Sequence, residues 1–139
     1  MLLPDAGEVV LDRLQACERD RLVMVLRPAA EGGSCPACQR LSQRTHSWYK
    51  RRLSDLPWEG VPVGIELHVR CFFCDNNGCD QQIFTEQLAE TAPRYARRTA
   101  RLAIAMEQIS RALGGSAGAR LAQQLGILAS GSTLLSAAA

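Results

Sequence analysis

Two short segments, Cys35-Pro36-Ala37-Cys38 and Cys74-Asp75-Asn76-Asn77-Gly78-Cys79, decide the fold that we predict for this chain. Each places two thiols at a spacing from which one turn of the chain supplies two ligands to a zinc ion. Asn77-Gly78 favours a turn in the second segment. Zinc prefers four thiolate or imidazole ligands in a tetrahedron. The two segments together therefore predict one zinc site, formed by Cys35, Cys38, Cys74 and Cys79.

The predicted metal is structural, because four protein thiolates leave no open position for a water molecule to be activated. Thirty-five residues separate Cys38 from Cys74, and strand patterns lie between them, which is typical of a zinc ribbon. Zinc binding of this kind contributes on the order of 10 kcal/mol or more to folding. We expect it to stabilise a β domain that is too small to depend on its apolar core alone.

Other residues compete for the metal. Cys71-Phe72-Phe73-Cys74 is a second Cys-x2-Cys spacing, but two aromatic residues favour a strand, in which positions i and i+3 face opposite sides. We therefore predict that Cys17 and Cys71 are ordinary buried or half-buried thiols. His46, and less so His68, are alternative ligands. A thiol redox role for Cys35 and Cys38 is the competing interpretation.

The composition indicates a folded protein without a membrane span. Apolar residues make up 47% of the 139 residues and charged residues 22%, as in globular proteins and unlike disordered tails. No apolar run approaches the roughly 18 to 20 residues that cross a bilayer, and the N-terminus lacks the features of a secretory signal. We expect a cytoplasmic protein with reduced thiols, no membrane partner and no small-molecule substrate.

The periodicity of apolar residues predicts an α+β fold. Alternation and turn signals indicate strands at residues 9–11, 22–26, 48–53, 61–70 and 83–84. Apolar residues that recur every three or four positions indicate helices at 95–113, from Ser116 to Leu125, and from Ser130 or Ser132 onward. Gly114-Gly115 and Gly126 are expected to end the first two helices. We predict a strand-rich, zinc-ribbon-like domain at residues 1–90, then a helical domain at 91–139.

The helical part fits a helix-turn-helix with Gly126 as the turn glycine and a truncated third helix. In this pattern Ala122 lies where the helices approach closely, and buried apolar side chains are expected at Leu121, Leu125, Ile127 and Leu135. Ser132 departs from the pattern, because its position usually holds an apolar residue. A small helical hairpin that packs against another surface is the alternative.

Basic residues gather in two blocks. Residues 32–54 hold five basic residues and no acid, and residues 91–139 hold six arginines against Glu107 alone. Such blocks either approach phosphate or form solvated surfaces. The expected phosphate contacts are Arg44, Lys50, Arg51, Arg52, Arg94, Arg97, Arg98, Arg101 and Arg120. The exposed positions expected on a recognition helix are Ser132, Thr133 and Ser136, which are weak readers of base edges. Trp48, Tyr49 and Trp58 are expected in the core, with DNA contact as the alternative.

An ordered set of motifs resembles one family. The set comprises Cys-Pro-x-Cys, His46-Ser47-x-Tyr49-x-Arg51, Asp55-Leu56-Pro57-Trp58, Phe73-Cys74-Asp75-Asn76, Ile83-Phe84-Thr85-Glu86, Tyr95-Ala96-Arg97-Arg98-Thr99 and Gly118-Ala119-Arg120-Leu121-Ala122. From about Leu2 to Leu135 it is similar to the N-terminal region of bacterial insertion-sequence transposases of the "L three" family. There a zinc-binding domain and a helix-turn-helix precede a ribonuclease H-like domain with an Asp-Asp-Glu triad.

The resemblance implies a zinc-dependent module that recognises the terminal inverted repeats of its element. By position, the same four cysteines match the zinc ligands of the family. The chain stops where the third helix should continue toward the catalytic domain, so we expect an excerpt or a truncated reading frame, and not an enzyme. The alternatives are a remnant that binds an intact transposase or itself and inhibits it, a thiol redox enzyme, and a zinc-ribbon adaptor that binds protein.

Overall fold

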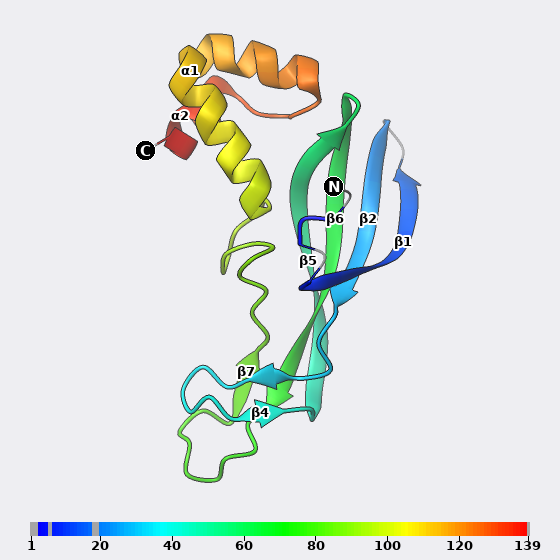
Figure 1. The fold of residues 1–139 in the computed structure, drawn as a ribbon, viewed down its shortest axis with the longest axis vertical. Helices are drawn as coiled ribbons and strands as arrows, with labels where there is room; N and C mark the ends of the chain where they lie inside the picture. Colours follow the sequence, from blue (N-terminus) through cyan, green and yellow to red (C-terminus); the bar gives the residue numbers. More distant parts are fainter. Residues whose placement is uncertain (1–2, 6, 18–19, 139) are drawn as a thin grey trace.

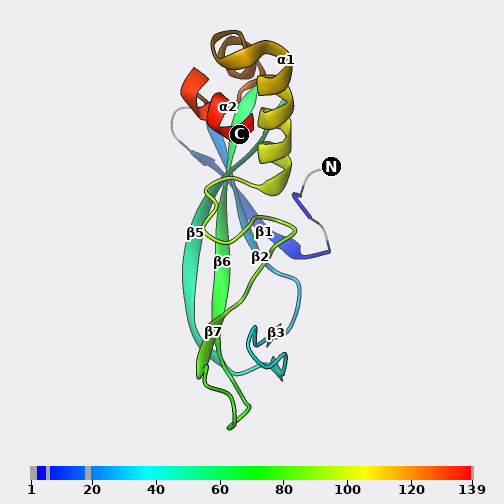
Figure 2. The same ribbon diagram turned by 90° about the vertical axis from the view of Figure 1, so that its left-hand side faces the viewer.

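The longest strands form a hairpin that runs from one end of the molecule to the other. In the computed structural model, which describes residues 3–5, 7–17 and 20–138, β5 (Thr45–Trp58) pairs antiparallel with β6 (Val61–Phe73). The tight turn uses Glu59 and Gly60, both at positive φ (48° and 82°). The helices lie near the turn of this hairpin (Figures 1 and 2), and Cys74 follows directly on the last residue of β6 at its open end.

Two further strands extend the hairpin into a sheet of order β1-β2-β6-β5. β1 (Val9–Cys17) pairs antiparallel with β2 (Arg21–Pro28), and β2 pairs parallel with β6. β7 (Ile83–Thr85) adds to β6 near the cysteines, where β3 (Gly33–Ser34) and β4 (Leu41–Ser42) form a small separate hairpin. The predicted strands at 9–11, 22–26, 48–53, 61–70 and 83–84 are therefore confirmed, and each of them is longer than predicted.

One face of the sheet carries the main core. Val63, Ile65, Leu67 and Val69 of β6 are at most 3% exposed, as their alternation along the strand predicts. They pack with Leu53 of β5 and with Leu88 and Ala92, which belong to the segment that leads from β7 to the helices. Gly64, Glu66 and His68 lie on the opposite face of β6, which we call the outer face.

The first helix begins later than predicted. α1 (Ala100–Leu125) starts after Thr99, whose hydroxyl caps it by accepting from the backbone N–H of Leu102. The predicted start at residue 95 is wrong because the preceding chain is bound to the sheet: Thr99 N–H donates to Ser54 O, and Ser54 N–H to Arg97 O, each at 2.9 Å. Tyr95 has φ 65°, which is not helical. A backbone held in this way cannot make the i−4 bonds of a helix.

The predicted breaks in the helical part are present. Gly114 has φ 76° and ψ −169° and kinks α1 where its end was predicted, and Gly126, at φ 93°, ends α1. A Cβ at Gly126 would lie 2.5 Å from the carbonyl oxygen of Gly60, so only glycine permits this approach of the helices to the hairpin turn. α2 (Gly131–Ala138) follows. The described residues therefore form an α+β fold: a strand-rich N-terminal part followed by two helices.

The burial predicted for the helices is partly wrong. Ala122 and Ile127 are buried as predicted, but Leu121, Leu125 and Leu135 are 36%, 45% and 56% exposed. The face of α1 that meets α2 carries Gly118 and Ala122, and Leu134 packs there instead of Leu135. The residue of α2 that turns inward is therefore Leu134, one position before the predicted Leu135.

The helical core is small. Its buried members are Leu102, Met106, Ala122, Ile127 and Leu134, with Leu56 of β5 packed against them. No helix among the described residues has the length and apolar character that a membrane crossing requires.

A buried carboxylate joins the hairpin to the start of α1. Asp55 of β5 is 4% exposed. It accepts hydrogen bonds from the Thr99 hydroxyl at 2.7 Å and from Nε and Nη2 of Arg101 at 2.8 and 2.5 Å. Arg101 also donates to the carbonyl oxygen of Leu3. The negative charge is therefore compensated, which the burial of a charge requires.

We predict that Asp55→Asn lowers the free energy of unfolding by about 2–4 kcal/mol, because it leaves the Arg101 guanidinium without its counter-charge in a partly buried place. Urea unfolding followed by far-UV circular dichroism measures the change. Glu107→Gln is the matched control, since Glu107 pairs with Arg111 on an exposed face of α1 and should cost about 0.5 kcal/mol or less. Equal losses in both variants would contradict a structural role for Asp55.

Candidate metal centre

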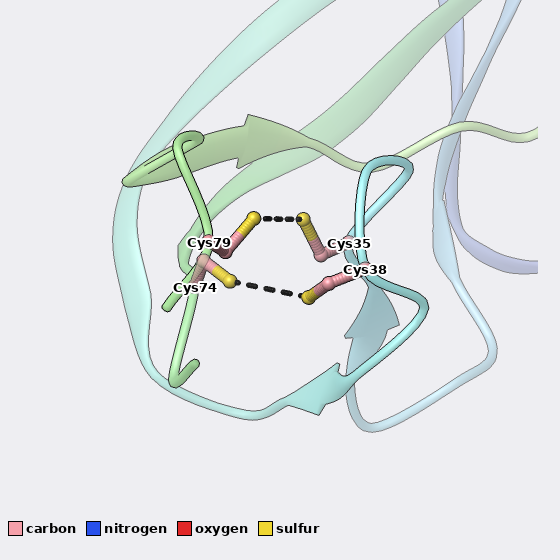
Figure 3. A group of neighbouring side chains, drawn as sticks. All are labelled: Cys35, Cys38, Cys74 and Cys79. Carbon is pink, nitrogen blue, oxygen red and sulfur yellow. Dashed lines mark hydrogen bonds between the residues drawn. The ribbon is translucent and has the colours of Figure 1, made fainter. Parts of the chain in front are cut away.

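The first cysteine pair lies in the turn between β3 and β4. The Cys35 N–H donates to Arg40 O at 3.0 Å, and the Gln39 N–H donates back to Cys35 O at 2.8 Å. Gln39 takes φ 64° to close this turn. These bonds fold residues 35–40 into a tight loop in which both thiols point to the same side (Figure 3).

The second pair lies in the loop between β6 and β7. The Cys74 N–H donates to Gln82 O at 2.8 Å, which continues the strand pairing one step further. The Cys79 N–H then donates to Asn76 O at 3.0 Å, and the Asn76 side chain accepts from the Gly78 N–H at 3.0 Å. The predicted turn at Asp75-Asn76-Asn77-Gly78 is therefore present, and it returns Cys79 toward Cys74.

The two pairs converge. Cys35 Sγ lies 3.9 Å from Cys79 Sγ, and Cys38 Sγ lies 3.6 Å from Cys74 Sγ. All four sulfurs lie within 4.8 Å of one another (Figure 3). A tetrahedron with Zn–S bonds of about 2.3 Å has S–S edges of about 3.8 Å, so the cluster has the donor set and the size that zinc requires. The predicted site of Cys35, Cys38, Cys74 and Cys79 is confirmed as a four-cysteine zinc site.

Aromatic side chains support the cluster from the sheet. Phe72 of β6 and Phe84 of β7 are at most 2% exposed, and their ring centroids lie 5.6 Å apart. They pack with Cys35, which is fully buried. A Cβ on Gly33 would lie 3.0 Å from the Phe72 ring, so glycine lets β3 approach this pair. The site is thus packed into the sheet end and excludes water on one side.

The other cysteine and histidine residues that were considered as ligands lie outside the cluster. Cys71 Sγ is 3.7 Å from the Thr85 hydroxyl and outside the cluster. His46 Nδ1 lies 2.9 Å from the Ser47 hydroxyl, and His68 Nε2 lies 3.0 Å from Glu66. The side chain of Cys17 is outside the described residues.

The neighbouring thiols of the cluster shift the pKa values of Cys38, Cys74 and Cys79 in different directions. The backbone N–H of Arg40 lowers the pKa of Cys38 to about 7. The backbone N–H of Asn76 lowers the pKa of Cys74. Burial and the neighbouring thiols of Cys38, Cys35 and Cys79 together outweigh this effect and raise the pKa to about 12. Burial and the Cys35 and Cys38 thiols likewise raise the pKa of Cys79, against the lowering effect of the Gln81 N–H. A bound divalent cation would lower the pKa values of the thiols that coordinate it, so that they bind as thiolates.

Several of the residues predicted to contact DNA are engaged within the protein. Arg44 pairs with Asp75 at 2.5 Å and lies over the Phe73 ring, and Lys50 pairs with Glu66 at 3.2 Å. Arg94 lies over the ring of Tyr95. Because the Arg44 and Lys50 side chains are each 63% exposed, their ion pairs are weak and can exchange for phosphate.

Two of the residues predicted to contact DNA hold parts of the fold together. Arg51 donates to the carbonyl oxygens of Pro93 and Ala96 at 3.0 and 2.8 Å, which ties the segment before α1 to β5. Arg101 is held by Asp55. Their guanidinium groups bind groups of the protein itself, which the sequence pattern did not reveal.

The other residues predicted to contact DNA make fewer contacts within the protein. Arg52, Arg97 and Arg120 are exposed and make no ion pair within the described part of the chain. Arg98 is half-buried with Nη1 3.4 Å from Met106 Sδ. On α2, Ser132 and Ser136 are exposed, and the Thr133 hydroxyl lies 2.9 Å from that of Ser130.

The three aromatic residues that were expected in the core differ in burial. Trp48 and Tyr49 are 57% and 37% exposed, whereas Trp58 packs against the core. Sequence reasoning also missed Arg21, which lines the same hollow as Arg97 and Arg98 because β2 pairs in parallel with β6. No local signal in the sequence marks that proximity.

The comparisons with known proteins agree with this geometry. Residues 31–79 match the family model described as the zinc-finger of transposase IS204/IS1001/IS1096/IS1165. The matched segment begins at Glu31, just before the first cysteine pair, and ends at the fourth cysteine. No curated protein and no solved structure matches the chain.

We predict that the protein binds about one zinc per chain, and that Cys38→Ser abolishes this binding and unfolds the β3–β4 hairpin, because three thiolates no longer enclose the ion. Zinc content by atomic emission and thermal unfolding measure both effects. Cys71→Ser is the matched control and should keep the zinc. Loss of zinc in the Cys71 variant alone would contradict the assigned ligand set.

Zinc affinity should fall as the pH is lowered, because protons compete with the metal for the thiolates. The Cys38 thiol is mostly ionised above pH 7 and becomes protonated below it, so the steepest weakening for this ligand lies below about pH 7. Titration with a chromophoric zinc chelator between pH 5.5 and 8 measures the change. An affinity that does not vary with pH would show that thiolates are not the ligands.

Proposed function

We propose that this chain, whose residues 31–79 are the zinc ribbon of ISL3-family transposases, is a DNA-binding module that engages the terminal inverted repeats of an insertion sequence. The observation that carries the proposal is the family match over a complete four-cysteine site. Transposases act on DNA, and a zinc ribbon without an open coordination position contributes structure and not hydrolysis. We assign the chain binding and no catalysis of its own, in the reducing cytoplasm.

The zinc site would act by fixing the position of the hairpin. It clamps the open end of β5–β6, while the turn of the same hairpin packs against the loop between α1 and α2 (Figure 1). The buried Asp55 network holds the start of α1 to β5. A rigid strand pair of this kind sets the distance between the two basic regions, so that both can meet one duplex.

The helical end supports a helix-turn-helix as part of the proposal. Gly118 and Ala122 permit close approach of the second half of α1 to α2, and Gly126 supplies the turn between them. The exposed Ser132 and Ser136 would face bases, and Arg97, Arg98 and Arg120 would face phosphates. Serines read base edges weakly, so we expect affinity to come mainly from phosphate contacts.

A second function is favoured by one observation. Leu121, Leu125, Leu128 and Leu135, four leucines of the helical end, are 36% to 74% exposed. Exposed apolar side chains in one region often mark a protein-binding surface. A partner such as another copy of the chain or an intact transposase would make it a regulator or an adaptor. Co-expression with an intact relative should then lower transposition frequency, and quadruple serine substitution of these leucines should relieve the effect.

We predict that the zinc-loaded chain binds duplex DNA with an affinity that falls steeply between 50 and 200 mM salt, because released counterions drive binding to phosphates. Arg97→Ala with Arg98→Ala should weaken binding to all sequences similarly, by roughly tenfold or more at low salt. Fluorescence anisotropy with a labelled duplex measures this.

Arg111→Ala is the control on the same helix, because Arg111 already pairs with Glu107. It should change affinity less than twofold. A zinc-loaded chain that binds no duplex at 50 mM salt would contradict the proposal and favour the protein-binding function.

A further inference from the structure

Arg21, the first residue of β2, lies between two hollows of the surface. Its guanidinium covers Gly64 of β6 on the outer face: a Cβ built on Gly64 would lie 2.7 Å from Nη2 of Arg21. Glycine leaves room for the Arg21 side chain to lie across β6 here, and a Cβ at this position would push the guanidinium aside. Arg21 is exposed, and no ion pair involves it within the described residues.

The first hollow opens on the outer face and has a volume of about 300 Å³. Arg21 and Arg52 line it from β2 and β5, with Gly64 and Glu66 of β6 between them. The single acid in this lining, Glu66, is paired with Lys50 at 3.2 Å, and its Oε1 also lies 3.0 Å from Nε2 of His68. Two guanidinium groups without a carboxylate partner therefore face this space, and they favour an anion.

The second hollow lies between the hairpin and the helices and has a volume of about 320 Å³. Arg21, Arg97 and Arg98 line it, over an apolar wall that includes Leu102 and Met106. The acid in its lining, Asp55, is bound by Arg101 and Thr99 and leaves no net negative charge. This hollow therefore also presents positive charge to a ligand.

We propose that Arg21, Arg52, Arg97 and Arg98 form one track for the phosphates of a DNA strand, in which neighbouring phosphates occupy the two hollows and Arg21 contacts both. The inference rests on the proposed DNA binding and adds to it the path of the backbone, across the outer face and along the start of α1. Guanidinium forks bind phosphate oxygens in pairs, and phosphate contacts position a protein on its duplex.

The test uses the zinc-loaded 139-residue chain and a fluorescein-labelled 20-base-pair duplex of mixed sequence in 50 to 200 mM salt. Arg21→Gln should weaken binding about five- to tenfold near 100 mM salt and lower the slope of log affinity against log salt by about one to two. Arg27→Gln is the matched control on the same strand. It removes the same charge about 20 Å away and should change affinity less than twofold.

Gly64→Ala tests the geometry without changing any charge. The added Cβ displaces the Arg21 side chain, so we expect a several-fold loss of affinity. Circular dichroism and zinc content confirm that each variant is folded. Should Gly64→Ala lower stability, Arg21→Gln, at an exposed position, decides the matter by itself.

The outcomes separate the two proposals. If the wild-type chain binds the duplex and Arg21→Gln behaves like Arg27→Gln, the track is wrong and the DNA-binding function stands. If the wild-type chain binds no duplex, the function fails and the track fails with it. Tighter binding to an RNA duplex of the same sequence would overturn the assignment to DNA.

Discussion

The structure depends on the coordination of one metal ion by four sulfurs from two distant segments. Cys35 and Cys38 precede the long hairpin, and Cys74 and Cys79 follow it, so closing the tetrahedron also closes the hairpin between them. Among the described residues, the apolar cluster at this end has three buried members, Cys35, Phe72 and Phe84. Burial of so few side chains contributes only several kcal/mol, whereas structural zinc contributes on the order of 10 kcal/mol. The metal therefore dominates the stability of the β3–β4 and β6–β7 loops.

The other end of the hairpin is held by different chemistry. Asp55, Thr99 and Arg101 form a compensated buried network, and Leu56 enters the helical core beside Leu102 and Met106. β5 thus takes part in both ends of the molecule. The strand connects the cysteine cluster to the surface that we propose for DNA.

Local sequence signals predicted the elements that local chemistry controls. The spacing within each cysteine pair, the alternation from Val63 to Val69, and the stops at Gly114 and Gly126 could be predicted because each depends on residues close in sequence. The start of α1 was not, because pairing of Ser54 with residues 97 and 99 holds that segment extended. Arg51 and Arg101 looked like open charges until tertiary contacts gave them partners. Arg21 became visible as a candidate only through the pairing of β2 with β6.

The central claim concerns the ligands of the metal, and X-ray absorption at the zinc edge of the purified protein tests it most directly. The account predicts four sulfur neighbours at about 2.3 Å and no nitrogen or oxygen in the coordination sphere. A sphere with two or more nitrogen or oxygen ligands at about 2.0 Å, or a folded protein that binds no zinc, would contradict it.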